Sequence, residues 1–322
     1  MIQQIKVIMV VGPTATGKSD LAVKLAQKFP GEIINADSRQ VYKLMDIGTN
    51  KGKIKPTNFQ IEINGYKISA YELENTEVLG WLFNVVKPDQ EFNLAHFQKL
   101  AYGIIADIFK RGKLPIITGG TGLYIDSLIK KYQLKDVAPD WELRKKLADF
   151  SGAELYNKLK ELNPQVAKLL NESDRKNPYR LIRKIEIALF SKKSIQFSFA
   201  KDQIKINSVM LYPKIKKAEL FQRIAKRVDL MFEQGLIAEV KKLIGLGYPD
   251  SKPMTGMGYK EVQAFLQRKI RLDVCKNKII QAHKKYADRQ ITWFEGKGRG
   301  YNLLKYDFKK DIKKINSEVK KF

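Results

Sequence analysis

A glycine-bracketed loop near the start of the chain has the residue types and spacing of a phosphate-binding site. Residues 12–19 read GPTATGKS. Gly12 and Gly17 allow backbone N–H groups to curve around an anion without a Cβ in the way, and a helix beginning there would add its positive dipole end. Lys18 supplies a point charge, and the Ser19 hydroxyl can ligate Mg²⁺. The loop predicted to bind phosphate or diphosphate consists of Gly12, Pro13, Thr14, Ala15, Thr16, Gly17, Lys18 and Ser19.

The segments on either side of the loop have the pattern that such a site requires. Residues 5–11 read IKVIMVV, an apolar run of strand length that is rich in β-branched residues. After the loop, Leu21, Leu25 and Phe29 fall on one helical face. Strand, loop and helix in this order favour a phosphate loop over a chance glycine turn. The motif does not specify the reaction.

Two further strands are predicted to end near this loop. Residues 32–36 lead to Asp37, and residues 114–118 lead to Gly-Gly-Thr, which ends at Thr121. Helices are expected at residues 94–110 and 123–129. Alternating strands and helices predict an α/β fold with a phosphate-loop NTPase-like parallel sheet core, whose ligands bind at the carboxyl ends of the strands. At that edge Asp37 is either a general base or the N-cap of a helix, and the local pattern does not decide between them.

Helical periodicity dominates the second half of the chain. Residues 140–193 form one amphipathic segment after another, which predicts an inserted helical subdomain. A core strand is expected at 206–213, followed by helices at 218–233, 237–246, 259–267 and 273–294. The predicted domains are a catalytic core of residues 1–135 and 200–322 and a helical insertion of residues 136–199. The basic tail FKKDIKKINSEVKKF is expected to form an amphipathic helix with a solvated charged face.

The charge balance indicates a polyanionic partner. Lys and Arg number 60 against 34 Asp and Glu, a net charge of +26 spread along the chain. Nucleic acid is the first expectation for such a surface. The single cysteine, Cys275, excludes an intramolecular disulfide, and neither His96 nor His283 has zinc-ligand spacing. Without an apolar run of about 20 residues or a signal-peptide pattern, we expect a cytoplasmic protein with no membrane partner. We also expect the protein to be a monomer.

Six motifs together resemble one enzyme family. GPTATGKS, ADSRQVYKLMDIGT, ITGGTGLYI, NPYRLIRKIEI, GMGYKE and RQITWF occur in this order between residues 7 and 294. They resemble the tRNA dimethylallyltransferases, which prenylate the adenosine next to the anticodon (position 37). The resemblance implies a phosphate-loop domain with a helical insertion that grips the anticodon stem-loop of tRNA. It also implies that the loop holds dimethylallyl diphosphate with Mg²⁺, and that adenine N6 attacks C1 of the prenyl group and releases diphosphate.

The same resemblance assigns roles to residues of this chain. Asp37 matches the general base, Thr121 a threonine near the diphosphate and the reacting centre, and Arg144 an arginine that contacts tRNA. The segments that match those holding the flipped base or the anticodon arm are Asp37, Ser38, Arg39 and Gln40; Tyr179, Arg180, Leu181, Ile182 and Arg183; Thr255, Gly256, Met257, Gly258, Tyr259 and Lys260; and Arg289, Gln290 and Trp293. The chain departs from the family pattern at Leu44, Thr255, Asp288 and Glu295, and in segment 57–90, part of which reads as a diverged hairpin.

Three other functions fit parts of the pattern. A small-molecule or nucleoside kinase would use the same loop for ATP, with Asp37 as the base and Arg180 and Arg183 as lid arginines. A non-catalytic RNA-binding protein could retain the loop without using it. Prenylation of free adenine nucleotides would need the same chemistry but not the large basic helical region. The net charge and the order of the six motifs favour the tRNA enzyme.

Overall fold

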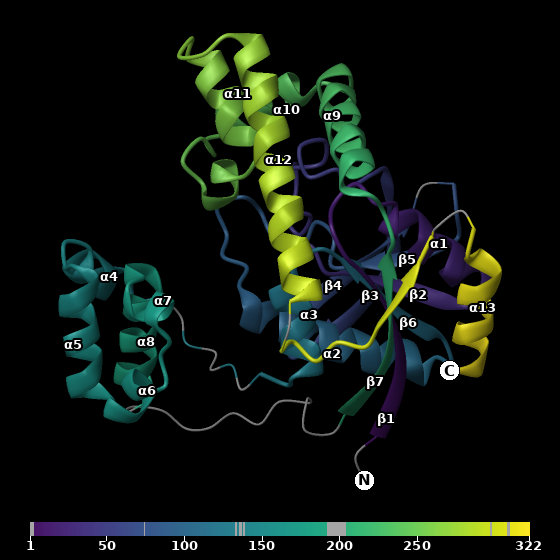
Figure 1. Cartoon of the computed structure of the whole chain (residues 1–322), viewed down its shortest axis with the longest axis horizontal. Helices are drawn as coiled ribbons and strands as arrows, with labels where there is room; N and C mark the ends of the chain where they lie inside the picture. The colour runs from purple at the N-terminus through teal and green to yellow at the C-terminus, as the bar shows by residue number, and fades with distance from the viewer. Residues whose placement is uncertain are drawn as a thin grey trace. The chain divides into compact units, whose positions relative to one another are not determined.

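The computed structural model of the chain describes residues 3–73, 75–132, 134, 137, 139–191, 204–296, 298–307 and 310–322. The chain forms two compact units, one of Met1–Tyr132 with Ala200–Phe322 and one of Gln133–Phe199 (Figure 1). Each unit has a hydrophobic core of its own.

The larger unit is built on one sheet, which has eight strands among the described residues. Their order is β3-β4-β5-β2-β6-β1-β7-β8. The strands are β1 (Gln3–Val11), β2 (Gly31–Asn35), β3 (Ile54–Ile63), β4 (Tyr66–Leu73), β5 (Leu79–Trp81), β6 (Leu114–Gly119), β7 (Ile204–Pro213) and β8 (Leu303–Tyr306). Neighbours from β5 to β8 pair in parallel, whereas β3 and β4 form an antiparallel hairpin at one edge. The predicted parallel α/β core is confirmed.

The register of the central strands brings the site segments to one edge of the sheet. Val11 at the end of β1 pairs with Gly119 at the end of β6, and Asn35 at the end of β2 pairs with Thr118. The carboxyl ends of parallel strands form the usual ligand-binding edge of such a sheet. The phosphate loop and Asp37 therefore leave the same edge of the sheet, on either side of the end of β6.

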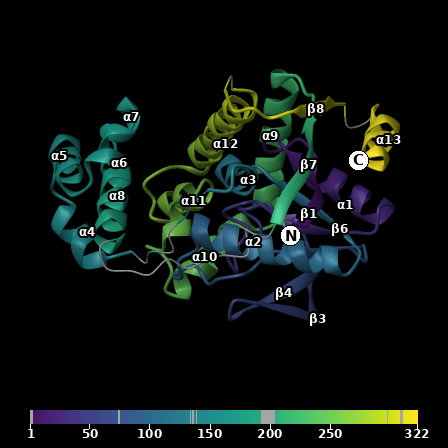
Figure 2. The same ribbon diagram turned by 90° about the horizontal axis from the view of Figure 1, so that it is seen from below.

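Helices cover both faces of the sheet because its central strands are apolar on both sides. On one face, α1 (Lys18–Lys28) and α13 (Ile312–Lys321) bury apolar side chains in a shared cluster, and Figure 2 shows the two helices near each other. On the other face lie α2 (Leu94–Lys110) and α3 (Gly122–Ile129). The predicted tail helix is confirmed as α13, and it buries Ile315 and Val319.

A group of helices after β7 completes the larger unit. These are α9 (Lys217–Glu233), α10 (Leu236–Gly245), the 3₁₀ turn η2 (Lys252–Thr255), α11 (Tyr259–Leu266) and α12 (Leu272–Glu295). Figure 1 shows α9, α11 and α12 extending together from the sheet. Buried side chains of α9, α10, α11 and α12 join the core cluster that includes α2 and α3. This packing places residues from the end of the chain beside residues from its beginning.

The smaller unit is entirely helical in its described part. It contains α4 (Trp141–Leu147), α5 (Gly152–Leu162), α6 (Pro164–Lys168), α7 (Glu172–Arg175) and α8 (Pro178–Ser191). Side-chain caps start four of these helices, at Asp140, Ser151, Asn163 and Asn171. Apolar residues of α4, α5, α6 and α8 form its core.

Short elements account for the main differences from the sequence prediction. β5 has 3 residues, and β8 and α7 have 4 each, so they contain too few residues to show a period. The predicted hairpin is confirmed as β3–β4. Its turn is Asn64-Gly65, where both residues have positive φ, 49° and 81°, as a tight hairpin turn requires. No helix in the described part of the chain is long and apolar enough to cross a membrane.

Candidate active site

The phosphate loop uses backbone conformations that most residues avoid. Gly12 and Gly17 have φ values of 131° and 80°, and Ala15 between them has a φ of 63°. A side chain at Gly12 would collide with β7, because a Cβ there would lie 2.8 Å from Cδ of Pro213. Loops of this kind form nests whose N–H groups converge on an anion. The left-handed conformation of Ala15 costs energy, as is common at functional sites.

Side chains of the loop fold over its own backbone. Nζ of Lys18 donates a hydrogen bond to the carbonyl of Pro13 at 2.5 Å, and Oγ1 of Thr16 donates to the same oxygen at 2.8 Å. Ser19 is exposed in the first turn of α1. The Lys18 ammonium, expected to bind diphosphate, and the Ser19 hydroxyl, expected to bind the metal, therefore both lie at the loop.

Two residues from the helices after β7 hold Thr14 in place. The Thr14 N–H donates to Oε1 of Gln290 at 2.8 Å, and Nε2 of Gln290 donates to the carbonyl of Gly120 at 2.8 Å. Gln290 thus ties the phosphate loop to the turn between β6 and α3. Nη1 of Arg227, on α9, donates to Oγ1 of Thr14 at 2.7 Å. Arg227 adds a second cation to the loop.

Asp37 lies beside Thr121, as the alignment of the strand ends predicts. Oδ1 of Asp37 accepts a hydrogen bond from the Arg39 N–H at 2.8 Å. The following residues form a turn, so the interpretation of Asp37 as a helix N-cap is wrong. Oγ1 of Thr121 accepts from the Ser38 N–H at 3.1 Å, and the Tyr286 hydroxyl also bonds the Thr121 side chain. These bonds fix the Asp37 turn against the end of β6.

A single carboxylate fixes the loop that continues from this turn. Glu239, on α10, accepts hydrogen bonds from the N–H groups of residues 46, 47 and 48 at 2.7 to 3.0 Å, and from the Tyr259 hydroxyl at 2.7 Å. The Tyr259 ring packs directly on Gly48, where a Cβ would lie 2.5 Å from Cζ of the ring. Tyr259 therefore helps to hold the loop at residues 46–48 in place, in addition to its predicted role in binding RNA.

Arg39 and Gln40 have partners in the same region. The Arg39 guanidinium lies 3.8 Å from the point that a Cβ of Gly256 would occupy. Nε2 of Gln40 donates to the carbonyls of Thr49 and Asn50, both at 3.1 Å. The structure thus brings residues 37–40 and 255–260 together, although more than 200 positions separate them in the sequence.

The phosphate loop, Asp37, Gln40 and the end of β6 at residues 118–120 line one cavity of about 380 Å³. Its polar side includes the phosphate loop, Asp37, Arg227 and Gln290. Its apolar side chains are Ala15, Val23, Ile33, Ile54, Leu73 and Phe83. A site with a polar half and an apolar half suits a ligand that has a charged head and a small hydrocarbon group.

The two cations of the cavity affect each other. Burial, reinforced by repulsion from Arg227 and opposed by the nearby Asp37 carboxylate, lowers the pKa of Lys18 to about 7. Burial also lowers the pKa of Arg227, while attraction to Asp20 and Asp37 opposes that change. Two neighbouring cations in a half-buried site disfavour each other's charge, and an anion between them relieves that repulsion.

No cluster of three or more His, Cys, Asp or Glu side chains in the described part of the chain could hold a metal ion. Mg²⁺ does not require such a cluster, because it usually binds one or two protein oxygens together with substrate phosphates. The Ser19 hydroxyl and the Asp37 carboxylate both line the cavity, so the available donors fit this mode of binding.

In the helical insertion, two predicted RNA-binding arginines share one buried carboxylate. Arg144 makes two bonds to Glu186, at 2.6 and 2.9 Å, and Nη1 of Arg183 makes another at 2.9 Å. Arg183 also donates to the Val137 carbonyl at 2.7 Å. Burial would raise the pKa of Glu186, but the bonds from Arg144 and Arg183 hold it below its ordinary value. Both guanidinium groups remain about one-third exposed, at 32% and 31%.

The neighbouring predicted residues differ in their exposure. Tyr179 is 87% exposed, and Arg180 forms an ion pair with Asp174 while staying 60% exposed. Leu181 is fully buried in the core of the insertion, and Ile182 packs against that core. Tyr179 and Arg180 therefore present side chains at the surface, whereas Leu181 stabilises the helix that carries them.

Trp293 is held by contacts within the protein. A Cβ on Gly122 would lie 2.2 Å from Cδ1 of the indole, and the Arg299 guanidinium lies 3.8 Å from a ring centroid on Trp293. Nε1 of Trp293 donates to the Tyr301 hydroxyl at 3.1 Å. These contacts anchor the end of α12 against the start of α3.

Comparison with known proteins supports the resemblance. The IPP transferase family model matches residues 40–297, and the isopentenyl transferase model matches residues 5–67. A tRNA dimethylallyltransferase of Acetivibrio thermocellus is 40% identical over 97% of this chain and 95% of its own length. One from Thermoanaerobacter sp. is 40% identical over 98% of this chain and 96% of its own length. The chain belongs to the IPP transferase family.

Solved structures agree with this family assignment. The full-length tRNA isopentenylpyrophosphate transferase of Bacillus halodurans has a TM-score of 0.66 and 32% identity, over 98% of this chain and 96% of that one. A eukaryotic dimethylallyltransferase acting on tRNA has a TM-score of 0.73 and 26% identity, over 98% of this chain and 78% of that one. These proteins are named for the transfer of isopentenyl or dimethylallyl groups, so the comparisons favour the prenyltransferase over the kinase.

The departures from the family pattern have local consequences. Leu44 stands where the family usually has Gly and adopts a φ of 66°, a conformation that favours glycine. Asp288 forms an ion pair with Lys217 at 2.7 Å, and Glu295 with Lys305 at 3.1 Å. The remaining departure is Thr255, whose Oγ1 donates a hydrogen bond to the carbonyl of residue 252 at 2.8 Å.

The sequence prediction missed three residues of the candidate site. Arg227 and Tyr286 lie within long amphipathic helices, where a charged or aromatic residue is ordinary, and Glu239 lies in a third such helix. No local motif marks them, since each reaches the site only through tertiary packing. The charge at position 227 falls one turn after Arg223, so the sequence alone does not distinguish the two arginines.

Proposed function

We propose that the protein transfers a dimethylallyl group from dimethylallyl diphosphate to N6 of the adenosine 3′-adjacent to the anticodon of tRNA, releasing diphosphate. The observation that carries the proposal is the single cavity shared by the phosphate loop, Asp37 and a set of apolar side chains. A diphosphate ester with a small hydrocarbon group matches the two halves of that cavity. The family assignment supports the same reaction.

The phosphate loop would bind the donor through its diphosphate. Backbone N–H groups, Lys18 and Arg227 are the groups placed to neutralise the negative charge, and that charge grows on the leaving oxygen as the C1–O bond breaks. Bound Mg²⁺, held by the Ser19 hydroxyl and diphosphate oxygens, would supply further charge neutralisation. Diphosphate binding should also return Lys18 to its protonated form, because an anion favours the ammonium.

Asp37 is the group placed to accept the proton of the acceptor amine. As N6 bonds to C1, the C1–O bond breaks with its electron pair on diphosphate, and one N6 proton passes to the carboxylate. Oδ1 of Asp37 is oriented by the Arg39 N–H, and Oδ2 accepts no hydrogen bond from the described residues. Thr121, beside it, would position the acceptor or the leaving group. An exocyclic amine is a weak nucleophile, so a positioned base contributes substantially to the rate.

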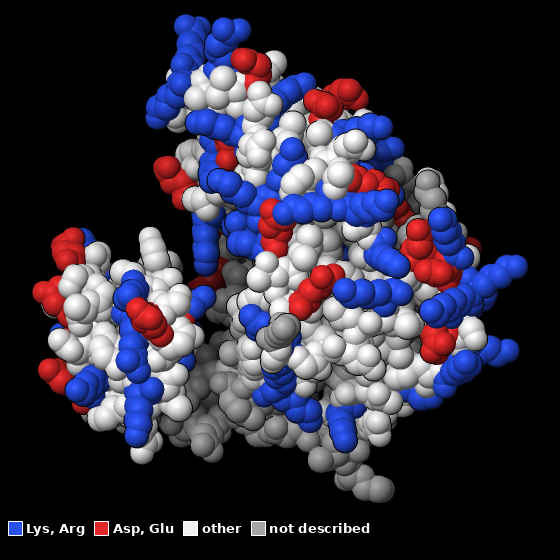
Figure 3. All heavy atoms as spheres, viewed as in Figure 1, with Lys and Arg blue, Asp and Glu red and all other residues white. Residues whose placement is uncertain are grey.

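The acceptor proposed is a base in an RNA loop, displaced from its stack. A second hollow of about 840 Å³ runs between α11 and α12, and its basic lining residues are Lys260, Lys278, Lys285 and Arg289. Figure 3 shows Lys and Arg gathered toward the far end of these helices. Such a groove suits a phosphate backbone. In the insertion, exposed Tyr179 and Arg180 are proposed to contact the anticodon stem-loop, since exposed aromatic and guanidinium groups stack on bases.

One assay tests the proposal. Purified protein is incubated with labelled dimethylallyl diphosphate, Mg²⁺ and unmodified tRNA that carries adenosine 3′ of the anticodon, and the digested nucleosides are analysed. Labelled N6-isopentenyladenosine is the expected product. Parallel reactions replace tRNA with AMP, or the donor with labelled ATP. Transfer to AMP but not tRNA would identify a nucleotide prenyltransferase, and phosphoryl transfer from ATP without prenyl transfer would identify a kinase.

A further inference from the structure

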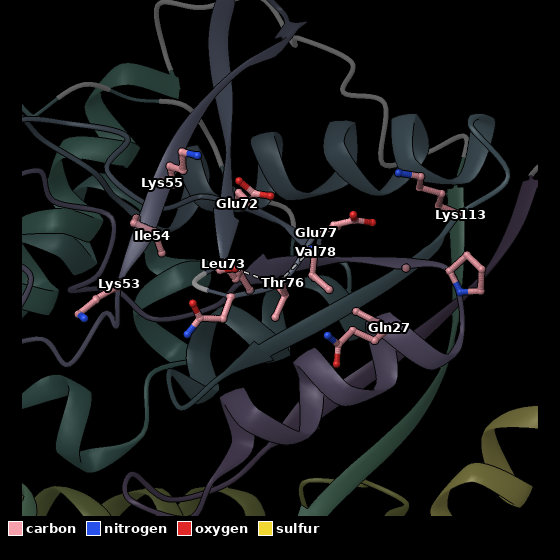
Figure 4. Close-up of a pocket in the computed structure, with 14 residues that line it drawn as sticks. Gln27, Lys53, Ile54, Lys55, Glu72, Leu73, Thr76, Glu77, Val78 and Lys113 are labelled. Atoms are coloured by element: carbon pink, nitrogen blue, oxygen red, sulfur yellow. Dashed lines mark hydrogen bonds between the residues drawn. The ribbon is translucent and has the colours of Figure 1, made fainter.

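Two apolar residues separate the cavity beside the phosphate loop, which we call the donor cavity, from another hollow of the larger unit. This outer cleft, of about 1070 Å³, lies between the end of α1 and the hairpin β3–β4 (Figure 4). Three residues line both the cleft and the donor cavity: Lys53, Ile54 and Leu73. A residue that lines two hollows lies between them. In Figure 4, Lys53 and Ile54 lie at one end of the cleft and Lys113 at the other, with Leu73 between them.

The strand register pairs the two apolar residues. Ile54 at the start of β3 is directly opposite Leu73 at the end of β4. Residues opposite each other in an antiparallel pair point to the same face of the sheet, with Cβ atoms about 5 Å apart. Hydrogen bonds hold the Leu73 end in place, because its N–H donates to the Val78 carbonyl at 3.0 Å and its own carbonyl accepts from Oγ1 of Thr76 at 2.8 Å. Ile54 and Leu73 thus form a fixed apolar barrier.

Phe83 extends this barrier on the donor side. A Cβ on Gly80, in β5, would lie 2.9 Å from Cδ2 of Leu73 and 2.9 Å from Cε2 of Phe83. Both side chains therefore lie over the same glycine, and Phe83 is only 7% exposed. Because the phosphate loop occupies the polar side of the cavity, the hydrocarbon end of the donor belongs against Ile54, Leu73 and Phe83.

We propose that the Ile54–Leu73 pair sets the chain length of the prenyl donor, an inference that rests on the proposed function. The donor cavity of about 380 Å³ must hold the diphosphate, the prenyl group and the incoming base. A donor one isoprene unit longer would have to pass the barrier and enter the outer cleft. The cleft has apolar contributions from Ala26, Pro30 and Val78, so shortening the barrier would give the extra unit a place to bind.

The test compares two donors with the full-length enzyme and tRNA. Dimethylallyl diphosphate and geranyl diphosphate are supplied separately with Mg²⁺, and kcat/KM is measured for each from the prenylated nucleoside. The wild type should prefer the shorter donor strongly. In Leu73→Ala and Ile54→Ala the ratio of geranyl to dimethylallyl transfer should rise by roughly tenfold or more, since hydrophobic pockets discriminate about 10- to 200-fold per methylene. The chemistry at C1 and the release of diphosphate are unchanged.

Leu79→Ala is the matched control. Leu79 lies in β5 next to Leu73's strand and is partly buried, but it packs into the core cluster on the opposite face of the sheet and lines neither hollow. Its substitution should leave the donor ratio unchanged. Should an alanine variant fail to fold, Leu73→Val and Ile54→Val shorten the same barrier by less and should shift the ratio in the same direction.

Two results would overturn the inference. One is a wild type that uses geranyl diphosphate as well as the shorter donor. The other is a set of folded barrier variants that transfer dimethylallyl normally but keep the wild-type donor ratio. Failure of the proposed function is a separate outcome, because the wild type would then transfer nothing from dimethylallyl diphosphate.

Discussion

Arg227 offers the sharpest test of how the site binds diphosphate. Its guanidinium donates to Oγ1 of Thr14 at 2.7 Å and lines the donor cavity. Arg227→Met keeps much of the length and apolar character of the side chain and removes the charge and the donors. The variant should therefore fold while losing one of the two cations that face the donor diphosphate.

The expected loss of affinity for diphosphate follows from the strength of a hydrogen bond between charged groups. A hydrogen bond to a charged group contributes about 1.5–3 kcal/mol, so diphosphate should bind roughly 10- to 150-fold more weakly to the variant. Removing Arg227 also relieves the repulsion that helps to lower the pKa of Lys18 to about 7. In the variant, Lys18 should remain protonated to a higher pH, although burial still lowers its pKa.

The lost contact with diphosphate and the change in the Lys18 pKa affect binding differently as the pH changes. At a pH below the Lys18 pKa of about 7, Lys18 is already charged in the wild type, so the variant shows the full loss of diphosphate affinity. Above that pH, the wild type must protonate Lys18 to bind the anion, which costs about 1.4 kcal/mol per pH unit. The variant pays less of that cost, so the ratio of variant to wild-type dissociation constants should shrink as the pH rises.

Isothermal titration with inorganic diphosphate and Mg²⁺, from about pH 6 to about pH 9, measures the dissociation constants of the wild type and the variant at each pH. The protonation of diphosphate itself is the same for both proteins and cancels in the ratio. Arg223→Met is the control, because Arg223 lies one turn earlier on α9 and pairs with Glu219 at the surface. Equal affinities for the wild type and the Arg227 variant would show that Arg227 does not face diphosphate. A ratio that stays constant with pH would show that it does not influence Lys18.

Other substitutions test the remaining roles. Lys18→Ala should abolish prenyl transfer but leave tRNA binding nearly unchanged in a filter-binding assay; a parallel loss of both would contradict the placement of Lys18 at the donor. Asp37→Asn can still accept the Arg39 N–H, so the turn should survive while single-turnover transfer falls by ~10²-fold or more; near-wild-type rates would exclude a base role. Arg183→Ala should weaken tRNA binding and reduce the salt slope by roughly 0.7–0.9 per lost phosphate contact. If the salt dependence of tRNA binding by Arg183→Ala has the same slope as that of the wild type and of a Lys313→Ala control, Arg183 only stabilises Glu186.

The sequence alone determined the parts of the site whose chemistry depends on neighbours along the chain. The phosphate loop is one continuous segment, and its glycines, lysine and serine have roles set by backbone conformation and by a helix N-terminus. The strands before Asp37 and Thr121 are short apolar runs that end in polar residues, so their alternation with helices predicted a parallel sheet and a common edge. Regular amphipathic spacing likewise predicted the long helices within a few residues.

Only the tertiary structure decided which distant side chains complete the site. Arg227, Glu239 and Tyr286 lie on three helices, and nothing in their own helices indicates which turn faces the site. That choice depends on how α9, α10 and α12 pack on the sheet. In the same way, the Ile54–Leu73 barrier depends on the register of a hairpin, because a shift of one residue would turn both side chains to the other face. Local patterns specify backbone conformation, whereas the distances between remote groups are set by packing.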